Sequence, residues 1–238
     1  MNLNGQAQQP TAEENGPLVL LADSQLLFAR QAGDLLQQRL RAHIAQWTQP
    51  PWAVYIGASN GCDPGFYDMA CDALKPLGIE QVWFLRQSLA DLEPMPAGPP
   101  AVILLAGGDP ETGWQVIGEP AVRDWLLRSR QQGSLLLGIS AGALHLTSGI
   151  VSGGGQARRK VFLDLYPAVT LVHEEQDHWP GYAAWQQCDP GPAIACLKIP
   201  FGAGVWIDRN RMETFGRQKA RLMRRDGEIP LPYLTSNN

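Results

Sequence analysis

The stretch Leu135–Leu146, "LLLGISAGALHL", decides how the rest of the chain is interpreted. An apolar run ends in Gly138, Ser140 follows among small residues, and an apolar helical pattern begins directly after it. A strand that enters a helix through Gly-x-Ser-x-Gly holds the serine in a tight turn, where bulky neighbours would collide with adjacent strands. The pattern favours Ser140 as an exposed nucleophile. The alternative is a small-residue turn that serves packing or binds phosphate.

Similar apolar runs occur on both sides of this stretch, separated by helical patterns or by turns rich in glycine and proline. The predicted strands cover residues 18–22, 52–59, 81–85, 101–106 and 134–139, and the predicted helices cover 25–47 and 66–77. Strands that alternate with helices predict an α/β fold with a doubly wound, mostly parallel sheet flanked by helices. Beyond Pro192, short segments between turns predict a final strand and small antiparallel hairpins at the C-terminus.

The functional loops of such a sheet lie beyond the carboxyl ends of its strands. Three apolar runs end at residues suited to catalysis or binding: Gly107-Gly108-Asp109, Ser140, and His173 after "AVTLV" at 168–172. We therefore expect these loops to converge at one edge of the sheet.

The helix after Ser140 starts at Ala141, whose N–H would stabilise negative charge that develops on a substrate oxygen. A second donor has to come from a neighbouring strand end. Gly108, in the glycine pair after the run at 101–106, is the expected supplier.

A nucleophilic serine needs a base, and the chain has four histidines. His43 falls within the first predicted helix. His145 is five residues beyond Ser140 on one helix, which turns it away by roughly 140°. His173 follows a predicted strand end and is the favoured base, with His178 in the loop "HEEQDHWPG" as the alternative.

The composition is that of a soluble globular protein, with 45% hydrophobic and 18% charged residues in 238. The net charge of −4 argues against nucleic acid as a partner, and no apolar run approaches the roughly 20 residues that span a bilayer. Four cysteines without metal-binding spacing predict reduced thiols. We expect a cytoplasmic protein with a disordered tail over residues 1–16 and a single domain over 17–238.

These motifs resemble those of peptidase family S51, which includes aspartyl dipeptidase (peptidase E) and cyanophycinase. The resemblance rests on "ILLAGGD", "GISAGA" and "LDLYPAVTLVH", and it extends from about Pro17 to Asp208. It implies a fold related to class I glutamine amidotransferases and hydrolysis of peptide or isopeptide bonds by a Ser-His-Glu triad, without a metal or another cofactor. Ser140 would be the nucleophile and His173 the base, with Gly108 and Ala141 as the oxyanion hole.

The first departure from that family concerns the acid of the triad. The segment that matches the family's glutamate motif reads "CLKIPFGAGVWI", which puts Phe201 at the expected position of the acid. Loss of this group from a serine triad can cost about 10⁴ in rate. Substitutes near the base or elsewhere in the chain are Glu174, Glu175, Asp177 and Asp189.

The second departure is the loop after His173, "HEEQDHW", which is acidic where acid-specific relatives carry basic residues. The hypothesis is that the substrate has a basic or neutral residue, rather than aspartate, before the scissile bond. Asp109, Glu174 and Glu175 are the candidate substrate-binding residues.

Three kinds of function follow from these observations. The leading prediction is a serine-type peptidase that acts on small peptides as an exopeptidase or dipeptidase. The alternatives are an esterase or other acyl-transfer enzyme on the same scaffold, and a weakened or inactive homologue that binds a peptide or a small acid. A glutamine amidotransferase is disfavoured because its nucleophile would be a cysteine. A homodimer is an assembly that the sequence allows.

Overall fold

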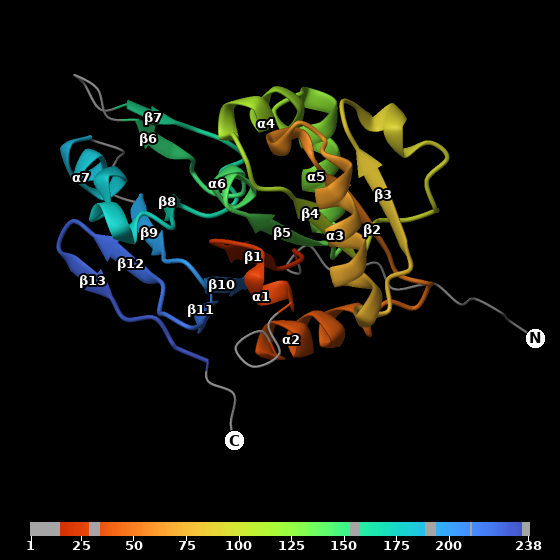
Figure 1. Ribbon diagram of the computed structural model, residues 1–238, viewed down its shortest axis with the longest axis horizontal. Helices are drawn as coiled ribbons and strands as arrows, with labels where there is room; N and C mark the ends of the chain where they lie inside the picture. Colours follow the sequence, from red (N-terminus) through yellow and green to blue (C-terminus); the bar gives the residue numbers. More distant parts are fainter. Residues whose placement is uncertain (1–14, 29–33, 153–157, 189–193, 210, 235–238) are drawn as a thin grey trace, which may run out of the picture.

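The computed structural model describes residues 15–28, 34–152, 158–188, 194–209 and 211–234. Its main sheet has seven strands in the order β11-β10-β1-β5-β4-β2-β3 (Figure 1). They are β1 (Leu18–Leu21), β2 (Trp52–Ile56), β3 (Gln81–Leu85), β4 (Val102–Leu105), β5 (Leu135–Ile139), β10 (Ala203–Asp208) and β11 (Arg211–Gly216). The first five are parallel to one another, and β10 and β11 pair antiparallel at one edge. The predicted α/β fold with a mostly parallel sheet is confirmed.

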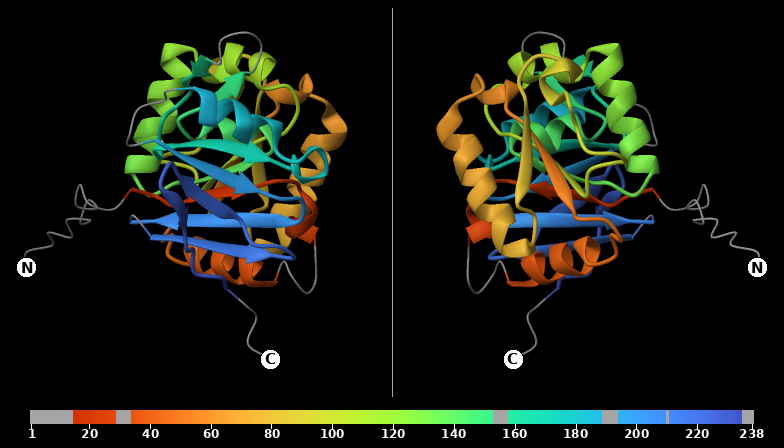
Figure 2. Two further views of the ribbon diagram at one scale, coloured as in Figure 1. Left: turned by 90° about the vertical axis from the view of Figure 1, so that its left-hand side faces the viewer. Right: turned by 90° about the vertical axis from the view of Figure 1, so that its right-hand side faces the viewer.

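Helices cover both faces of this sheet, as Figure 2 shows. On one face, α2 (Asp34–Ile44) and α3 (Pro64–Leu74) pack against the side chains of alternate strand positions such as Val19 and Leu21. On the other, α5 (Pro120–Gln131) packs against the intervening positions such as Leu18 and Leu20. The inner strands β1 and β4 are apolar at every position because both of their faces are buried.

A second sheet has four strands in the order β13-β12-β9-β8. The strands are β8 (Ala168–Val172), β9 (Ala195–Ile199), β12 (Arg221–Arg224) and β13 (Gly227–Ile229). Leu197 and Ile199 pack into the core that α5 covers, whereas Val169, Leu171 and Cys196 pack under α7 (Pro180–Gln187). A small hairpin of β6 (Ile150–Ser152) and β7 (Arg158–Lys160) lies beside it in Figure 1.

The position of β8 corrects one expectation. The sequence predicts that the strand before His173 ends at the same sheet edge as the others, but β8 belongs to the second sheet, where it pairs in parallel with β9. Both faces of β8 are nevertheless buried, so its run of apolar residues looks like that of a central strand.

Two predicted helices differ in detail from those in the structure. The helix expected over 25–47 is described as α1 (Gln25–Phe28) and α2, on either side of residues 29–33, which lie outside the described part. The helix expected over 66–77 begins earlier, because Asp63 caps the first turn of α3 by accepting from the Gly65 N–H. It ends in a 3₁₀ turn (Lys75–Leu77) closed by Gly78 in the left-handed conformation.

Three helices that the sequence analysis did not predict are α4 (Pro110–Ile117), α5 and α7. All three start with a proline, and in α4 and α5 an acidic residue precedes it, Asp109 or Glu119. Proline at the first helical position is a recognisable start signal, because it needs no hydrogen bond for its nitrogen there.

The expected tail, residues 1–16, lies outside the described residues except for its end. Gly16 is buried, and its N–H donates to Arg130 O at 2.8 Å. All four cysteines are free thiols, as predicted. Within the described ranges, no helix is long and apolar enough to cross a membrane.

Candidate active site

Ser140 occupies a strained turn between β5 and α6 (Ala141–His145), with φ 50° and ψ −113°. The glycines on either side are a steric requirement of this turn. A Cβ on Gly138 would lie 2.4 Å from Gly142 O, and a Cβ on Gly142 would lie 2.1 Å from Leu105 O. Such contacts are impossible, so the small residues give the clearance that the tight turn needs. Non-glycine residues at positive φ cluster at functional sites.

His173 lies within hydrogen-bonding distance of this serine. Its Nε2 is 3.0 Å from Ser140 Oγ. The two residues come from different sheets, because Ser140 follows β5 of the main sheet and His173 follows β8 of the second sheet. The His173 N–H donates to Ile199 O at 2.9 Å, which fixes the backbone at the end of β8. With Nε2 accepting from the serine hydroxyl, the imidazole proton resides on Nδ1. This is the geometry of a nucleophile and its base.

The other histidines lie elsewhere. His178, the alternative base, is exposed in the left-handed conformation after the 3₁₀ turn Glu175–Asp177, and within the described residues its ring has no hydrogen-bond partner. His43 is on α2, near the amino ends of the parallel strands, where burial lowers its pKa.

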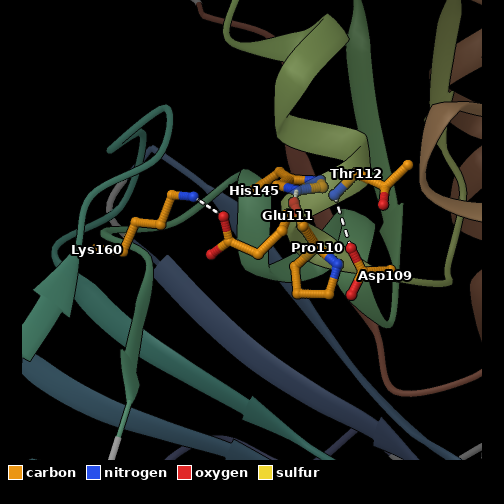
Figure 3. A network of polar contacts seen from close by, with 6 residues as sticks. All are labelled: Asp109, Pro110, Glu111, Thr112, His145 and Lys160. Carbon is orange, nitrogen blue, oxygen red and sulfur yellow. Dashed lines mark hydrogen bonds and ion pairs between the residues drawn. The ribbon is translucent and has the colours of Figure 1, made fainter.

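His145 contacts the first residue of α4 (Figure 3). Its Nε2 is 2.8 Å from Pro110 O, and it packs against the rings of Trp114 and Phe162. Burial lowers the pKa of His145 to about 4, so the ring is neutral and donates from Nε2 to the carbonyl. This side chain fixes the start of α4 and does not contact Ser140.

The glycine pair after β4 lies against the serine turn. A Cβ on Gly107 would be 3.2 Å from the Cβ of Ser140. Gly108 has φ +130°, and a Cβ there would be 2.1 Å from Ser59 O, so only glycine fits. Within the described residues, the N–H groups of Gly108 and Ala141 have no backbone acceptor, which leaves both available to a substrate oxygen.

Asp109 directly follows this pair and caps α4. Its Oδ1 accepts from the Thr112 N–H at 2.7 Å, and this hydrogen bond lowers the pKa of the exposed carboxyl (Figure 3). The neighbouring Glu111 forms an ion pair with Lys160 of the β6–β7 hairpin.

Phe201, which stands where the resemblance places the acid, lies in the turn between β9 and β10 and is 43% exposed. Glu175 Oε1 accepts a hydrogen bond from the Phe201 N–H at 2.9 Å, and Asp23 Oδ2 accepts one from the Gly202 N–H at 2.6 Å. The Glu175 carboxylate therefore stabilises the turn that contains Phe201. The second oxygen of Glu175, Oε2, is buried and has no hydrogen-bond partner within the described part of the chain.

Glu174 is half-buried beside the histidine. Its Oε2 accepts from the Gly181 N–H at 2.9 Å, and its carboxylate lies within electrostatic range of His173 and of the Lys198 ammonium. Burial raises the pKa of Glu174, and these three neighbours oppose that rise. Lys198 itself is buried under the rings of Trp179 and Tyr182.

No carboxylate of the described residues is hydrogen-bonded to the ring of His173. Asp177 is exposed, and Asp189 lies outside the described residues. The site thus consists of a Ser140–His173 pair with Glu174 and Glu175 close to the base in the chain. Nor do the described residues include a group of three or more His, Cys, Asp or Glu side chains that could hold a metal ion.

Two cavities flank the main sheet at opposite ends. One, of about 1000 Å³, lies near the amino ends of β1 and β5 and is lined by polar residues that include Arg39, His43 and Glu213. The other, of about 280 Å³, is mostly apolar and is lined by the Gly107–Gly108 loop and Ile139, next to Ser140. Of these two cavities, the smaller one adjoins the candidate active site.

Comparison with known proteins gives the fold. No family profile matches the chain, and no curated protein matches it significantly. A peptidase from an acI-B1 Actinobacterium superposes with a TM-score of 0.72 and 16% identity, over 93% of this chain and 96% of that one. A candidate peptidase E protein from Listeria monocytogenes EGD-e has a TM-score of 0.59 and 17% identity, over 86% of this chain and 100% of that one. The chain therefore has the fold of these peptidases.

Proposed function

We propose that the protein is a serine hydrolase that cleaves small peptides through an acyl-enzyme on Ser140. The observation that carries the proposal is the 3.0 Å contact between Ser140 Oγ and His173 Nε2, made by a serine held at φ 50° in a strand-to-helix turn. A strained serine at a helix start beside an imidazole has no evident structural role. It matches the arrangement of nucleophile and base that acyl transfer requires.

The residues account for each step of such a reaction. Ser140 Oγ bonds to the substrate's carbonyl carbon while His173 Nε2 takes the hydroxyl proton. The carbonyl oxygen becomes negative and accepts hydrogen bonds from the N–H groups of Gly108 and Ala141. The carbonyl then re-forms, the carbon–nitrogen bond breaks, and His173 gives its proton to the departing amine. Water attacks the resulting ester, His173 takes a proton from the water and returns it to Ser140 Oγ, and a carboxylic acid leaves.

The motifs and the fold also support a proposal about the family of the chain. We infer that the chain is a distant member of the aspartyl dipeptidase and cyanophycinase family, supported by "GISAGA", "ILLAGGD" and the fold shared with peptidases. Its preference would differ from that of acid-specific members. The loop after His173 carries Glu174, Glu175 and Asp177 and no arginine, and acidic groups repel a substrate carboxylate.

An esterase is the second candidate, favoured by one observation. His173 has no hydrogen-bonded carboxylate within the described residues, and a base without such a partner is a weaker catalyst. Esters have better leaving groups than amides, so a Ser–His pair alone hydrolyses them more readily. A ratio of ester to amide turnover above that of an ordinary serine peptidase would favour this candidate.

A fluorophosphonate probe tests the proposal, because it reacts with activated serines. We expect the wild type to be labelled, Ser140→Ala to remain unlabelled, and His173→Ala to be labelled at least about 100-fold more slowly, since general-base catalysis contributes that much or more. His178→Ala is the matched control and should be labelled like the wild type. A folded wild-type protein that does not react would instead support a binding protein without hydrolase activity.

A further inference from the structure

The reaction steps described above do not involve the apolar cavity beside Ser140. It has a volume of about 280 Å³ and lies under α3, between the Gly107–Gly108 loop and α1. Its walls come from segments far apart in the sequence, including Leu27 and Phe28, Phe66 and Met69, and Ile139. We propose that it is a specificity pocket that binds an apolar side chain of the substrate, an inference that rests on the proposed function.

The location of the cavity points to the residue whose carbonyl is attacked. Gly107 and Gly108 form part of its wall, Gly107 packs against Ser140, and Gly108 is the proposed oxyanion donor. A carbonyl oxygen held by Gly108 places its own residue beside this wall. The side chain that enters the cavity therefore belongs to the acyl part of the substrate rather than to the leaving amine.

The lining determines the chemical class of that side chain. Of the described residues that line the cavity, none is charged. Its main polar groups already pair with each other, because Asn60 Nδ2 donates to Tyr55 Oη at 2.8 Å, and Tyr55 is buried in the core. A carboxylate or ammonium group would lose its hydration here without gaining a partner, which is unfavourable.

The mouth of the cavity is also apolar. Six large hydrophobic side chains are exposed in the described structure, and three of them, Phe28, Phe66 and Met69, line this one cavity at 44%, 51% and 42% exposure. Exposed apolar groups gathered around a cavity are typical of a ligand-binding site. Methionine in particular adapts its shape to different apolar partners.

The volume suits one side chain of medium to large size. An apolar cavity of about 150 Å³ is sufficient to hold a benzene molecule. A cavity of about 280 Å³ accommodates a phenylalanine, leucine or methionine side chain. The hypothesis of a basic or neutral residue before the scissile bond is thereby narrowed to a neutral, apolar one.

A series of dipeptides X-Ala, with X as Phe, Leu, Ala, Asp or Arg, tests the pocket. We expect kcat/KM for Phe-Ala and Leu-Ala to exceed that for Ala-Ala by about 10- to 100-fold, since burial of such side chains supplies that much discrimination. Asp-Ala and Arg-Ala should be cleaved more slowly than Ala-Ala. Equal or faster cleavage of Asp-Ala would overturn the proposal.

Met69→Arg places a charge at the mouth and should abolish the preference for Phe over Ala. Met95→Arg is the matched control, because Met95 is also an exposed methionine, at 37%, but does not line the cavity. Met95→Arg should keep wild-type labelling by a small fluorophosphonate, and thermal unfolding checks that both variants fold. A preference that persists in Met69→Arg would contradict the pocket.

A binding measurement tests the pocket independently of the proposed hydrolysis. Isothermal titration of the Ser140→Ala variant with the same dipeptides needs no turnover. Tighter binding of Phe-Ala than of Ala-Ala, lost on adding Met69→Arg, supports the pocket even if the wild type hydrolyses nothing. Fluorophosphonate labelling of Ser140 together with equal binding of all dipeptides would leave the hydrolase proposal intact and refute the pocket.

Discussion

Replacing Ser140 or His173 by alanine is expected to lower kcat/KM by about 10⁴-fold or more, and replacing both should lower it no further. The reason is that the two side chains act as a unit: the hydroxyl oxygen attacks only as the imidazole 3.0 Å away removes its proton. Once one member is absent, the other has nothing to act on. The measurement is steady-state kinetics of the two single variants and the double variant with one dipeptide or ester.

His178→Ala is the control for this prediction, because His178 lies five residues from His173 on the exposed surface. Its activity should equal that of the wild type. If His178→Ala loses activity while His173→Ala keeps it, the base has been assigned to the wrong residue. Additive losses in the double variant would show that the two side chains do not act together.

Gly108→Ala has the second-largest expected effect, a fall in kcat of about 10²- to 10³-fold. A Cβ at this position would lie 2.1 Å from Ser59 O and 2.9 Å from Asn60 N, and alanine rarely adopts its φ of +130°. The loop therefore has to move, and its N–H no longer points at the substrate oxygen. Steady-state kinetics and thermal unfolding should be measured together, since both activity and stability fall.

Gly78→Ala separates the two effects. Gly78 also has a positive φ, +91°, but a Cβ there would have no neighbour within 4 Å. The residue closes the 3₁₀ turn that follows α3 and is not part of the candidate active site. This variant should lose about 1 kcal/mol of stability for its backbone strain and keep its activity. Equal activity of Gly108→Ala and Gly78→Ala would mean that the Gly108 N–H takes no part in catalysis.

Much of the site could be predicted from the sequence because its signals are local. Only glycine fits at positions 138 and 142 on either side of Ser140, and only glycine fits at position 108, so the motif encodes the geometry directly. Strand and helix alternation likewise encodes a parallel sheet. The starts of α4 and α5 were encoded just as locally, in Asp109-Pro110 and Glu119-Pro120, and were missed.

Other features depend on contacts between distant segments, which no local pattern reports. β8 has the apolar run of a central strand, yet it pairs with β9 in a second sheet, so the sequence suggests that His173 approaches Ser140 without revealing that it does so from another sheet. The same holds for Glu175, whose hydrogen bond to the Phe201 N–H joins residues 26 positions apart. The apolar cavity combines short segments from α1, α3, β4 and β5, each of which alone looks like ordinary core.

The acyl-enzyme itself is the most direct test of the central claim. An activated ester with an apolar acyl group should be mixed with the wild type, quenched within the first turnover, digested and analysed by mass spectrometry. We predict that the peptide containing Ser140 gains the mass of the acyl group and that this adduct is absent from Ser140→Ala. Turnover without an adduct on Ser140, or with the acyl group on another residue, would contradict the proposed mechanism.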